Sequence, residues 1–351
     1  MAEQSPSILD VAQRAGVSVA TASRVMSRST YPVSETTKRK VLEAASALNY
    51  IPNSLARGLR IQRSGLIAVL VGDNTDPYFA EITRGVEEIA NQQDYLTIVC
   101  NAERDPKKEL HYLRSLRDYR IDGVIFAGGG LNIPGHIEQL EAVVQEMQRH
   151  EAAVITLAQH TLHVPSVQAD NFGGAKQMTT HLLALGHQRI AFVAGPSDQL
   201  VANVRLQGYM TALIEAGHNV NPALIIPGNF THQSGAQAVD SIAYLASTER
   251  PTAIFAANDE TALGVLQGIH KHGWRVPEDI SVCGFGDLPI AQLVQPALTS
   301  VHIPLRELGR KGTKYLLALL RHEQVPTLEV LPTTIIERAT TTLLMTSTTN
   351  P

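Results

Sequence analysis

Small and hydrogen-bonding side chains gather in one short stretch near the N-terminus, which reads Ser18-Val19-Ala20-Thr21-Ala22-Ser23-Arg24. Hydroxyl and guanidinium groups pair with base edges in the major groove of DNA, and small neighbours let a helix approach those edges closely. The chemistry open to this stretch is therefore base reading, by Ser18, Val19, Ala20, Thr21, Ser23 and Arg24. An ordinary helical hairpin is the alternative.

Three short helices would position these residues. The first has an apolar face of residues at helical spacing: Ile8, Val11, Ala12 and Ala15. Gly16 then allows the backbone angles of a tight turn, and the Ser18 hydroxyl can cap a second helix that starts at Val19. A third helix is expected from Val33-Ser34 to Asn49-Tyr50, and it closes a small core with its apolar residues: Val41, Leu42, Ala45 and Leu48.

The order of the motifs in this region is specific. The chain reads DVAxxAGVSxATxSRV, then VSxxT, then LNYIPNSLARGLR, in one run from residue 7 to residue 60. This run closely resembles the LacI/GalR family of bacterial transcription regulators, and the resemblance continues through the rest of the chain.

The resemblance implies a hinge helix at residues 53–60, which folds on operator DNA. Leu59 would be its wedge, because an apolar side chain pushed between base pairs of the minor groove unstacks them and kinks the duplex. A linker leucine that packs on the core is the alternative. Ser34, Tyr50 and Asn53 complete the DNA-binding residues that we expect.

The charge distribution separates this head from the rest of the chain. Residues 1–63 hold nine Lys and Arg against four Asp and Glu, a balance of +5. The whole chain carries −4, so residues 64–351 carry −9. A basic head on an acidic body suits a DNA-binding module joined to a ligand-sensing domain, because phosphate contacts supply much of the affinity for DNA.

Length and composition indicate an ordinary globular protein. With 351 residues, of which 44% are hydrophobic and 18% charged, the chain can form two or three folding units. The sequence shows no basic-then-apolar signal region and no apolar run near the roughly 20 residues that span a bilayer, so we expect a cytoplasmic protein. Cys100 and Cys283 are expected to be reduced and buried, and neither a metal site nor a cofactor is expected.

From Leu66 onward, short apolar runs alternate with amphipathic stretches of helical length. The runs suit parallel strands covered on both faces: 66–71, 96–100, 123–127, 153–157, 189–193, 253–257 and 280–284. The expected helices are 79–92, 107–119, 172–185, 201–216, 234–246, 259–272 and 304–320. This alternation predicts an α/β architecture with parallel sheets.

The alternation falls into two series, split near Pro165, which predicts two similar lobes. The family resemblance implies that each lobe is a parallel sheet like half of a sugar-binding periplasmic protein, and that three crossovers join the lobes. We therefore expect a helix-turn-helix domain at 1–62 and an effector-binding and dimerisation domain at 63–351. Its first lobe should comprise 63–164 and 296–330, and its second lobe 165–295 and 331–351.

Two facing lobes make a cleft, because ligands of open α/β sheets bind at the carboxyl ends of the strands. Tyr78 and Phe79 follow the first strand and could stack on a sugar or a base. Arg205 matches a position where the family often uses arginine on effector oxygens. Its fixed fork suits a carboxylate, a phosphate or paired hydroxyls. Phe230 matches an aromatic residue that can cover the ligand.

Polar residues at further strand ends complete the expected cleft. Asn258 can both donate to and accept from hydroxyls, whereas Asp259 is expected to cap the helix that follows it. Asp170 likewise lies between a strand and a helix.

One departure from the family pattern bears on the ligand. Many members read GYDD or GFDD after the strand ending at Gly284, and this chain reads Gly284-Phe285-Gly286-Asp287. A carboxylate that commonly holds neutral sugar hydroxyls is thus absent at Gly286, which favours an acidic ligand in a cleft that keeps Arg205. The phrase GFGDLPIAQ also resembles the branch of the family that answers to gluconate-type sugar acids. A bulkier neutral sugar in the space at Gly286 is the alternative.

The sequence as a whole predicts a transcription repressor of carbohydrate genes, controlled by a small sugar or sugar acid. One short helix reads too few base pairs, so we expect a homodimer on a pseudo-palindromic operator. Effector binding would change the angle between the lobes and with it operator affinity. A neutral sugar, a nucleobase or a phosphorylated effector remains open.

Two other function classes share the body pattern. A sugar-binding transport protein would need a signal peptide in place of residues 1–60. A nucleotide-binding enzyme would need a dinucleotide fingerprint, and the sequence has neither this nor a G-x-S-x-G elbow. Both classes are therefore disfavoured.

Overall fold

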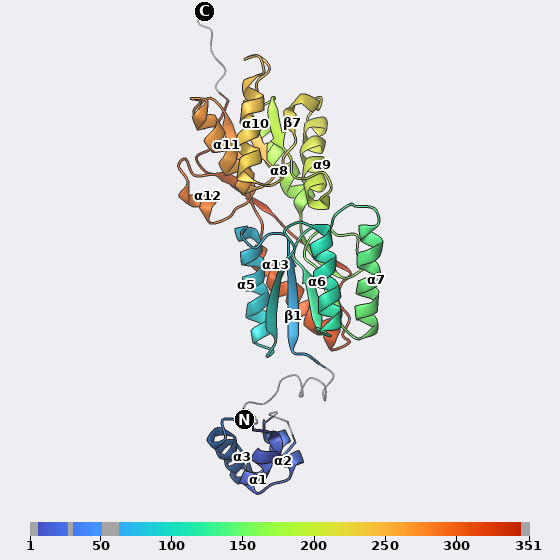
Figure 1. Ribbon diagram of the computed structural model, residues 1–351. Coiled ribbons are helices and arrows are strands. Elements are labelled where there is room, and N and C mark those ends of the chain that lie inside the picture. Colours follow the sequence, from blue (N-terminus) through green and yellow to red (C-terminus); the bar gives the residue numbers. More distant parts are fainter. Residues whose placement is uncertain (1–5, 27–30, 51–62, 345–351) are drawn as a thin grey trace, which may run out of the picture. The chain divides into compact units, whose positions relative to one another are not determined.

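The computed structural model describes residues 6–26, 31–50 and 63–344. The chain divides into two compact units, Met1–Gly65 and Leu66–Pro351 (Figure 1). The predicted hinge helix at 53–60, with Asn53 and Leu59, lies outside the described residues.

The N-terminal unit contains three helices: α1 (Ile8–Ala15), α2 (Val19–Met26) and α3 (Glu35–Ala47). Gly16 ends α1 at φ 65°, the left-handed conformation that favours glycine. The Ser18 hydroxyl accepts from the Thr21 amide at 3.1 Å, and Ser34 caps α3 by accepting from the Thr37 amide at 3.3 Å. The predicted turn and caps therefore form as expected.

The core of this unit differs from the prediction at one position. Its buried residues are Val11, Ala12, Ala22, Val41, Ala44 and Ala45, with Leu48 packed against them. Leu42 was predicted to be in the core, but it is 53% exposed. The prediction for Leu42 was wrong because the buried face of α3 consists of Val41, Ala44 and Ala45, which follow the helical spacing of three and four residues. Leu42, one residue after Val41, points away from this face.

The larger unit contains two six-stranded sheets. The sheet of the first lobe has the order β11 (Leu328–Leu331), β5 (Ser166–Ala169), β4 (Ala153–Thr156), β3 (Gly123–Phe126), β1 (Leu66–Val71) and β2 (Leu96–Asn101). The sheet of the second lobe has the order β12 (Thr334–Ile336), β10 (Thr299–His302), β9 (Ser281–Gly286), β8 (Ala253–Ala256), β6 (Ile190–Val193) and β7 (Ile225–Ile226). Every strand pair is parallel except β10 with β12.

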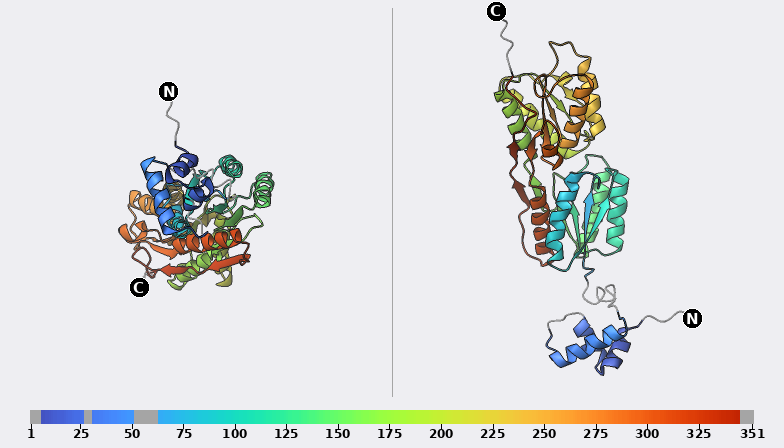
Figure 2. Two further views of the ribbon diagram at one scale, coloured as in Figure 1. Left: turned by 90° about the horizontal axis from the view of Figure 1, so that it is seen from below. Right: turned by 90° about the vertical axis from the view of Figure 1, so that its left-hand side faces the viewer.

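Helices cover both faces of each sheet (Figures 1 and 2). In the first lobe these are α5 (Pro77–Asn91) and α13 (Leu305–Leu320) on one face, and α6 (Pro106–Asp118) and α7 (His136–Arg149) on the other. In the second lobe they are α8 (Asn171–Ala184), α9 (Leu200–Glu215), α10 (His232–Ala243) and α11 (Asp259–Lys271), with the short α12 (Ile290–Leu293) after β9.

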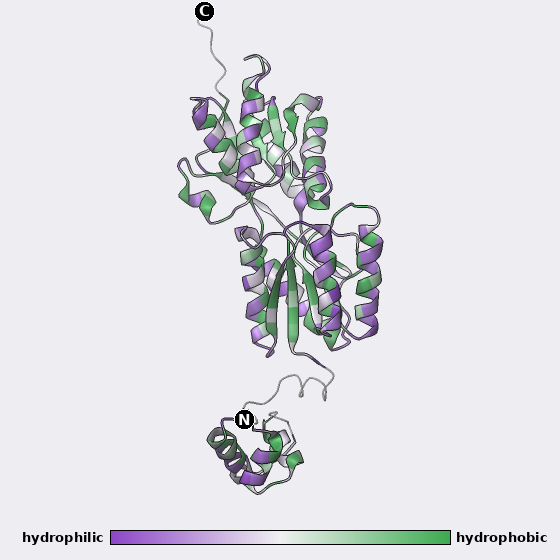
Figure 3. Ribbon diagram, in the orientation of Figure 1, coloured by the Kyte–Doolittle hydropathy of each residue, from purple (hydrophilic) through white to green (hydrophobic). Residues whose placement is uncertain are grey.

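The apolar strands explain these layers. In β1, Ile67 and Val69 pack into the core under α5 and α13, while Ala68 and Leu70 pack into a separate core under α6 and α7. Alternate residues of a strand face opposite sides of its sheet, so a strand covered on both faces must be apolar throughout. Figure 3 shows these strands as hydrophobic and the outer faces of the helices as hydrophilic.

Three crossovers connect the lobes, as expected, but at different residues. They follow β5, β10 and β11. The predicted lobe boundaries were wrong at two places, because β5 (within 165–295) belongs to the first sheet and β10 (within 296–330) belongs to the second. Helix α7 was not among the predicted helices.

Candidate nucleic-acid interface and ligand cleft

Helix α2 presents the predicted base-reading residues at the surface of the N-terminal unit. Ser18, Val19 and Ala20 are exposed, whereas Thr21, Ser23 and Arg24 are half-buried. Ala22, in the middle of this stretch, is fully buried and anchors α2 on the core. The Arg24 guanidinium carbon lies 4.2 Å from the centre of the Tyr31 ring. The N-terminal half of α2 is thus free to approach another molecule.

The other predicted DNA contacts also have structural roles. The hydroxyls of Ser18 and Ser34 serve as helix caps. Tyr50 packs partly against the core of the unit, and its amide donates to the Ala45 carbonyl at 2.9 Å.

A cavity of about 520 Å³ of empty space lies between the lobes of the larger unit, partly open to solvent. The first lobe lines it with Asp76, Tyr78, Phe79, Arg104, Gly128 and Gly129, and the second with Gln199, Val201, Arg205, Phe230, Asn258, Phe285 and Leu288. Five of the predicted effector residues are brought together here: Tyr78, Phe79, Arg205, Phe230 and Asn258.

Arg205 is buried in the cavity wall, with 4% of its surface exposed. Its Nε donates to the Asn171 Oδ1 at 2.9 Å and its Nη1 to the Ala257 carbonyl at 2.6 Å. Its guanidinium carbon lies 4.0 Å from the centre of the Phe285 ring. Within the described part of the chain no carboxylate makes an ion pair with Arg205, and no protein group accepts from its Nη2. Burial lowers the pKa of Arg205 to about 10, so it remains charged at neutral pH.

Aromatic rings close the cavity around this cation. Tyr78 and Phe79 meet edge to face with ring centres 5.1 Å apart. Phe230 has φ 65°, a strained conformation for a residue with a side chain, and the Asn258 Nδ2 donates to its carbonyl at 3.1 Å. This hydrogen bond helps to offset the strain and so keeps Phe230 at the cavity.

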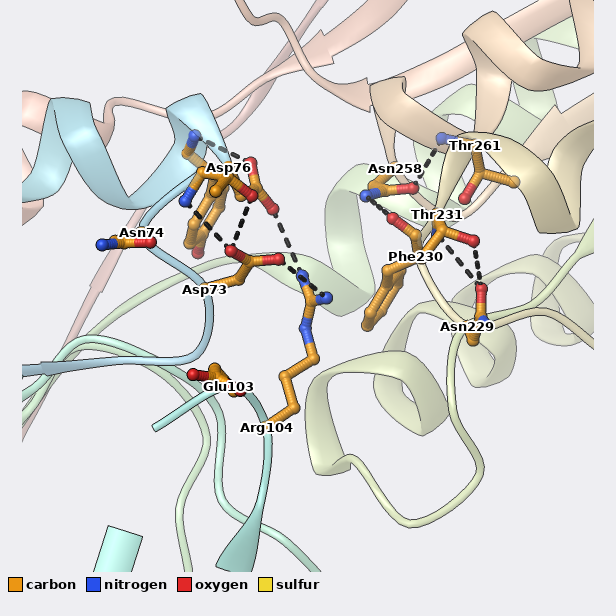
Figure 4. A network of polar contacts seen from close by, with 12 residues as sticks. Asp73, Asn74, Asp76, Glu103, Arg104, Asn229, Phe230, Thr231, Asn258 and Thr261 are labelled. Atoms are coloured by element: carbon orange, nitrogen blue, oxygen red, sulfur yellow. Dashed lines mark hydrogen bonds and ion pairs between the residues drawn. The ribbon is translucent and has the colours of Figure 1, made fainter. Parts of the chain in front are cut away.

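Asp76 and Arg104 line the same cavity but were not predicted. The Asp76 carboxylate caps α5 by accepting from the Tyr78 amide at 2.9 Å. Burial raises the pKa of Asp76, and the Tyr78 amide and Arg104 oppose the rise. The Arg104 guanidinium reaches Asp76 at 3.4 Å and Asp73 at 3.7 Å, facing Phe230 and Asn258 of the second lobe (Figure 4). Arg104 follows strand β2, so the rule that ligands bind at strand ends could have found it.

Three other predicted effector residues do not line the cavity. Asp170 caps α8, where it accepts from the Gly173 amide at 2.7 Å. Asp287 pairs with Arg338 at 2.7 Å and with the His302 Nδ1 at 3.0 Å. Gly286 has φ 137°, which residues with a side chain rarely adopt, and a Cβ there would lie 3.3 Å from the Asp259 Oδ2.

The cap of α11 was assigned to the wrong residue. Asn258, rather than Asp259, caps this helix by accepting from the Thr261 amide at 3.0 Å. Asp259 is fully buried and accepts from the Ser300 hydroxyl at 2.5 Å and from the Leu288 amide at 2.7 Å. Burial raises its pKa to about 6. Asp259 thus holds the turn that places Leu288 in the cavity wall.

A direct backbone connection joins the lobes beside the cavity. The Asn132 amide of the first lobe donates to the Asp198 carbonyl at 2.7 Å, and the Leu200 amide of the second donates to the Gly130 carbonyl at 3.1 Å. Leu131 and Gln199 thereby form a short antiparallel bridge, which we call the interlobe bridge. A Cβ on Gly129 would lie 2.6 Å from the Val201 Cγ2, so glycine is needed for this approach. Gly128-Gly129-Gly130 is therefore a lobe contact held by hydrogen bonds.

The described residues show neither a metal centre nor a membrane-spanning helix. Across residues 6–26, 31–50 and 63–344, no group of three or more His, Cys, Asp and Glu side chains could hold a metal ion. None of the helices in those same ranges is both long and apolar enough to cross a membrane. Cys100 and Cys283 are free and buried.

Comparisons with known proteins match both units. Residues 7–53 match the family model of bacterial regulatory proteins of the lacI family, and residues 179–341 match that of a periplasmic binding protein-like domain. The chain is 35% identical over 321 residues to catabolite control protein A of Priestia megaterium, which covers 91% of this chain and 93% of that protein.

Solved structures match over nearly the whole chain. The lac repressor dimer bound to operator and the anti-inducer ONPF has a TM-score of 0.84 at 29% identity, and the match covers 97% of this chain and 100% of that one. The transcriptional regulator CelR in complex with cellobiose has a TM-score of 0.70 at 30% identity, covering 95% and 99%.

Proposed function

The chain belongs to the LacI family of bacterial transcription regulators, and from this premise we propose that it represses carbohydrate genes in response to a sugar acid. It is a DNA-binding regulator and not an enzyme. Since a regulator acts where the chromosome is, the proposal places the protein in the cytoplasm.

The DNA-binding part of the proposal rests on α2. Its exposed residues Ser18, Val19 and Ala20 would face base edges, with Arg24 beside them. One such helix reads few base pairs, so two copies related by a two-fold axis would read the two half-sites of an operator. The similar lac repressor is a dimer on its operator, which supports a homodimer here.

The effector part rests on one observation, the buried Arg205, which makes no ion pair with a carboxylate of the described residues. The cavity lining carries two guanidinium groups, Arg104 and Arg205, against one carboxylate, Asp76. A buried charge is costly unless it is paired, and the Nη2 of Arg205 can donate to a ligand that brings a carboxylate. An acid with hydroxyl groups therefore suits the cavity better than a neutral sugar does.

Regulation would follow from the shared lining of the cavity. Because both lobes contact the ligand, binding would stabilise the lobe arrangement in which the cavity is complete. Any change in operator affinity caused by effector must be matched by an equal change in effector affinity caused by operator.

Calorimetry tests the ligand class on the full chain. Gluconate and its uncharged counterpart, sorbitol, differ mainly in the carboxylate, so we expect gluconate to bind at least about tenfold more tightly, as a charge-assisted hydrogen bond allows. Tighter binding of sorbitol or glucose would instead show a neutral-sugar regulator. Tighter binding of 6-phosphogluconate or of a nucleobase would assign the cavity to those classes.

A further inference from the structure

A second cavity, of about 480 Å³ of empty space that includes open solvent, adjoins the first on the side of the first lobe. Its own lining comes from the ends of β1 and β3, the loop after β2 and the first turn of α6: Leu70, Val71, Gly72, Ala102, Asp105, Glu109, Phe126 and Leu131. Five residues line both cavities: Phe79, Arg104, Gly128, Gly129 and Gln199. The two cavities are therefore neighbouring chambers with a common wall.

The second chamber has a different charge from the first. Its charged side chains are one guanidinium, Arg104, and two carboxylates, Asp105 and Glu109. Arg104 is already placed beside Asp76 and Asp73. An additional anion would therefore be repelled here, and a neutral group with hydrogen-bond donors would be accepted.

The carboxylates of the second chamber have acceptor capacity left over. Glu109 is 16% exposed, and its Oε2 contacts the buried His136 Nε2 at 2.8 Å. The Asp105 Oδ1 accepts from the Lys107 amide at 2.8 Å. Among the described residues, no protein group donates to the Glu109 Oε1 or the Asp105 Oδ2. Sugar hydroxyls are donors that fit such oxygens. The apolar residues Leu70, Val71 and Phe126 are buried in the core behind the chamber, so the recognition of a sugar here would rest on the two carboxylates.

We propose that the second chamber is a binding subsite for a neutral glycosyl unit, so that the effector is a sugar acid of two units. The carboxylate of this effector would contact Arg205 in the first chamber. The carbon chain of the effector would pass Arg104, and the hydroxyls of its glycosyl unit would donate to Glu109 in the second chamber. This proposal rests on the proposed function only for the carboxylate of the effector. The binding of the neutral glycosyl unit depends on the residues of the second chamber and not on that function.

The test uses calorimetry on the full chain with three probes. Gluconate fills one chamber, lactobionate is gluconate with a galactosyl unit attached, and lactose is a neutral sugar of two units. We expect lactobionate to bind about tenfold more tightly than gluconate, since hydrogen bonds to a charged acceptor allow a difference of this size.

Two variants locate the extra affinity. Glu109→Gln should reduce the advantage of lactobionate over gluconate several-fold, because a neutral amide is a weaker acceptor. Glu103→Gln makes the same chemical change next to the chamber, on a side chain that is 59% exposed and pairs with Lys108, and it should change neither affinity. Circular dichroism and thermal unfolding of both variants show whether the fold is kept. If Glu109→Gln disturbs it, the ratio of lactobionate to gluconate affinity in the unmodified chain still decides.

The outcomes separate the two proposals. Equal or weaker binding of lactobionate than of gluconate overturns the second subsite and leaves the sugar-acid assignment in place. Tight binding of lactose with weak binding of gluconate overturns the sugar-acid assignment and supports the subsite. If a folded Glu109→Gln protein keeps the full preference for lactobionate over gluconate, the second subsite is overturned. If the protein binds none of the three probes, the second subsite and the sugar-acid assignment are both overturned.

Discussion

The interlobe bridge can be weakened by one substitution that the backbone accommodates. Leu200 is the first residue of α9, where its amide donates to Gly130 across the lobes. Leu200→Pro removes this amide. Proline is favoured at the first position of a helix, and the preceding Gln199 has φ −90° and ψ 123°, as residues before proline prefer. The change should therefore leave the helix in place while it removes one hydrogen bond between the lobes and pushes the Gly130 carbonyl away, because the proline Cδ replaces the amide hydrogen that points at this carbonyl.

The expected size follows from that single bond. A hydrogen bond contributes about 0.5–1.5 kcal/mol, and the clash of the proline ring with the Gly130 carbonyl adds to this, so the bridged arrangement should become less favoured by at least about 2- to 12-fold. Hydrogen exchange of the Asn132 amide measures this directly, because Asn132 makes the other bond of the bridge. Its exchange should accelerate by at least this factor as long as the bridged arrangement predominates. Gluconate, if it is the effector, should lose much less affinity, because its apparent affinity follows the fraction of the protein that is bridged.

Leu200→Ala is the matched control, since it shortens the same side chain and keeps the amide. Equal exchange rates at Asn132 in the proline and alanine variants would refute the idea that the bridge holds the lobes together. Slower exchange in the proline variant would refute it too. Exchange at the buried amides of β1 serves as a reference, because global destabilisation would accelerate those sites as well.

Three further predictions concern single residues. Arg24→Ala should weaken operator binding by about 1–3 kcal/mol in a gel-shift titration, with no loss of thermal stability, and unchanged affinity would remove Arg24 from the reading surface. Gly286→Asp and Gly286→Asn should both destabilise the fold by about 1–3 kcal/mol, because either side chain is strained at φ 137°. The Asp variant should bind gluconate several-fold more weakly than the Asn variant, and equal calorimetric affinities would argue against an acidic effector. The pKa of Asp259 is about 6 in the folded protein, against an ordinary value of 3.8. The protonated carboxyl group therefore adds to the free energy of unfolding in full below pH 3.8, and this contribution is lost as the pH rises through about 6. The stability of the unmodified chain relative to Asp259→Asn, measured by urea unfolding, should therefore increase from pH 7 to pH 5, and a flat difference would show that the Asp259 pKa is not raised.

Local signals allowed much of the fold to be predicted. Gly16 and Ser18 set the turn and cap between α1 and α2 through their own backbone and side-chain preferences. The apolar run of β1 indicated a strand covered on both faces. The partner of a strand is not local, however. β5 and β10 stay in the sheets of the strands that precede them, β4 and β9, and each lies immediately before a crossover, so the predicted splits at Pro165 and at residue 296 fell one strand too early.

In the cavity, too, the positions of single residues could be predicted from the sequence, but their contacts with residues far away in the sequence could not. The position of Arg205 was predictable, but its burial and its lack of a carboxylate partner arise from Asn171 and Ala257, which are distant in sequence. Asp259 does not cap α11, as had been expected, because Ser300 and Leu288 provide two donors for its carboxylate, and Asn258 caps the helix instead. Such partners come from other helices, strands and loops of the fold, and one sequence does not reveal them.

The three crossovers also determine when each part of the protein can fold during its synthesis. The N-terminal unit has its own core within residues 8–50, so it can fold early. The first lobe starts at Leu66, yet the face of its sheet near β3 and β4 is covered by Leu308, Leu316 and Leu317 of α13. Domains generally fold as units while the ribosome extends the chain from the N-terminus. The lobe that begins first is therefore completed only after nearly the whole chain has been made, and until then its apolar sheet face needs protection from aggregation.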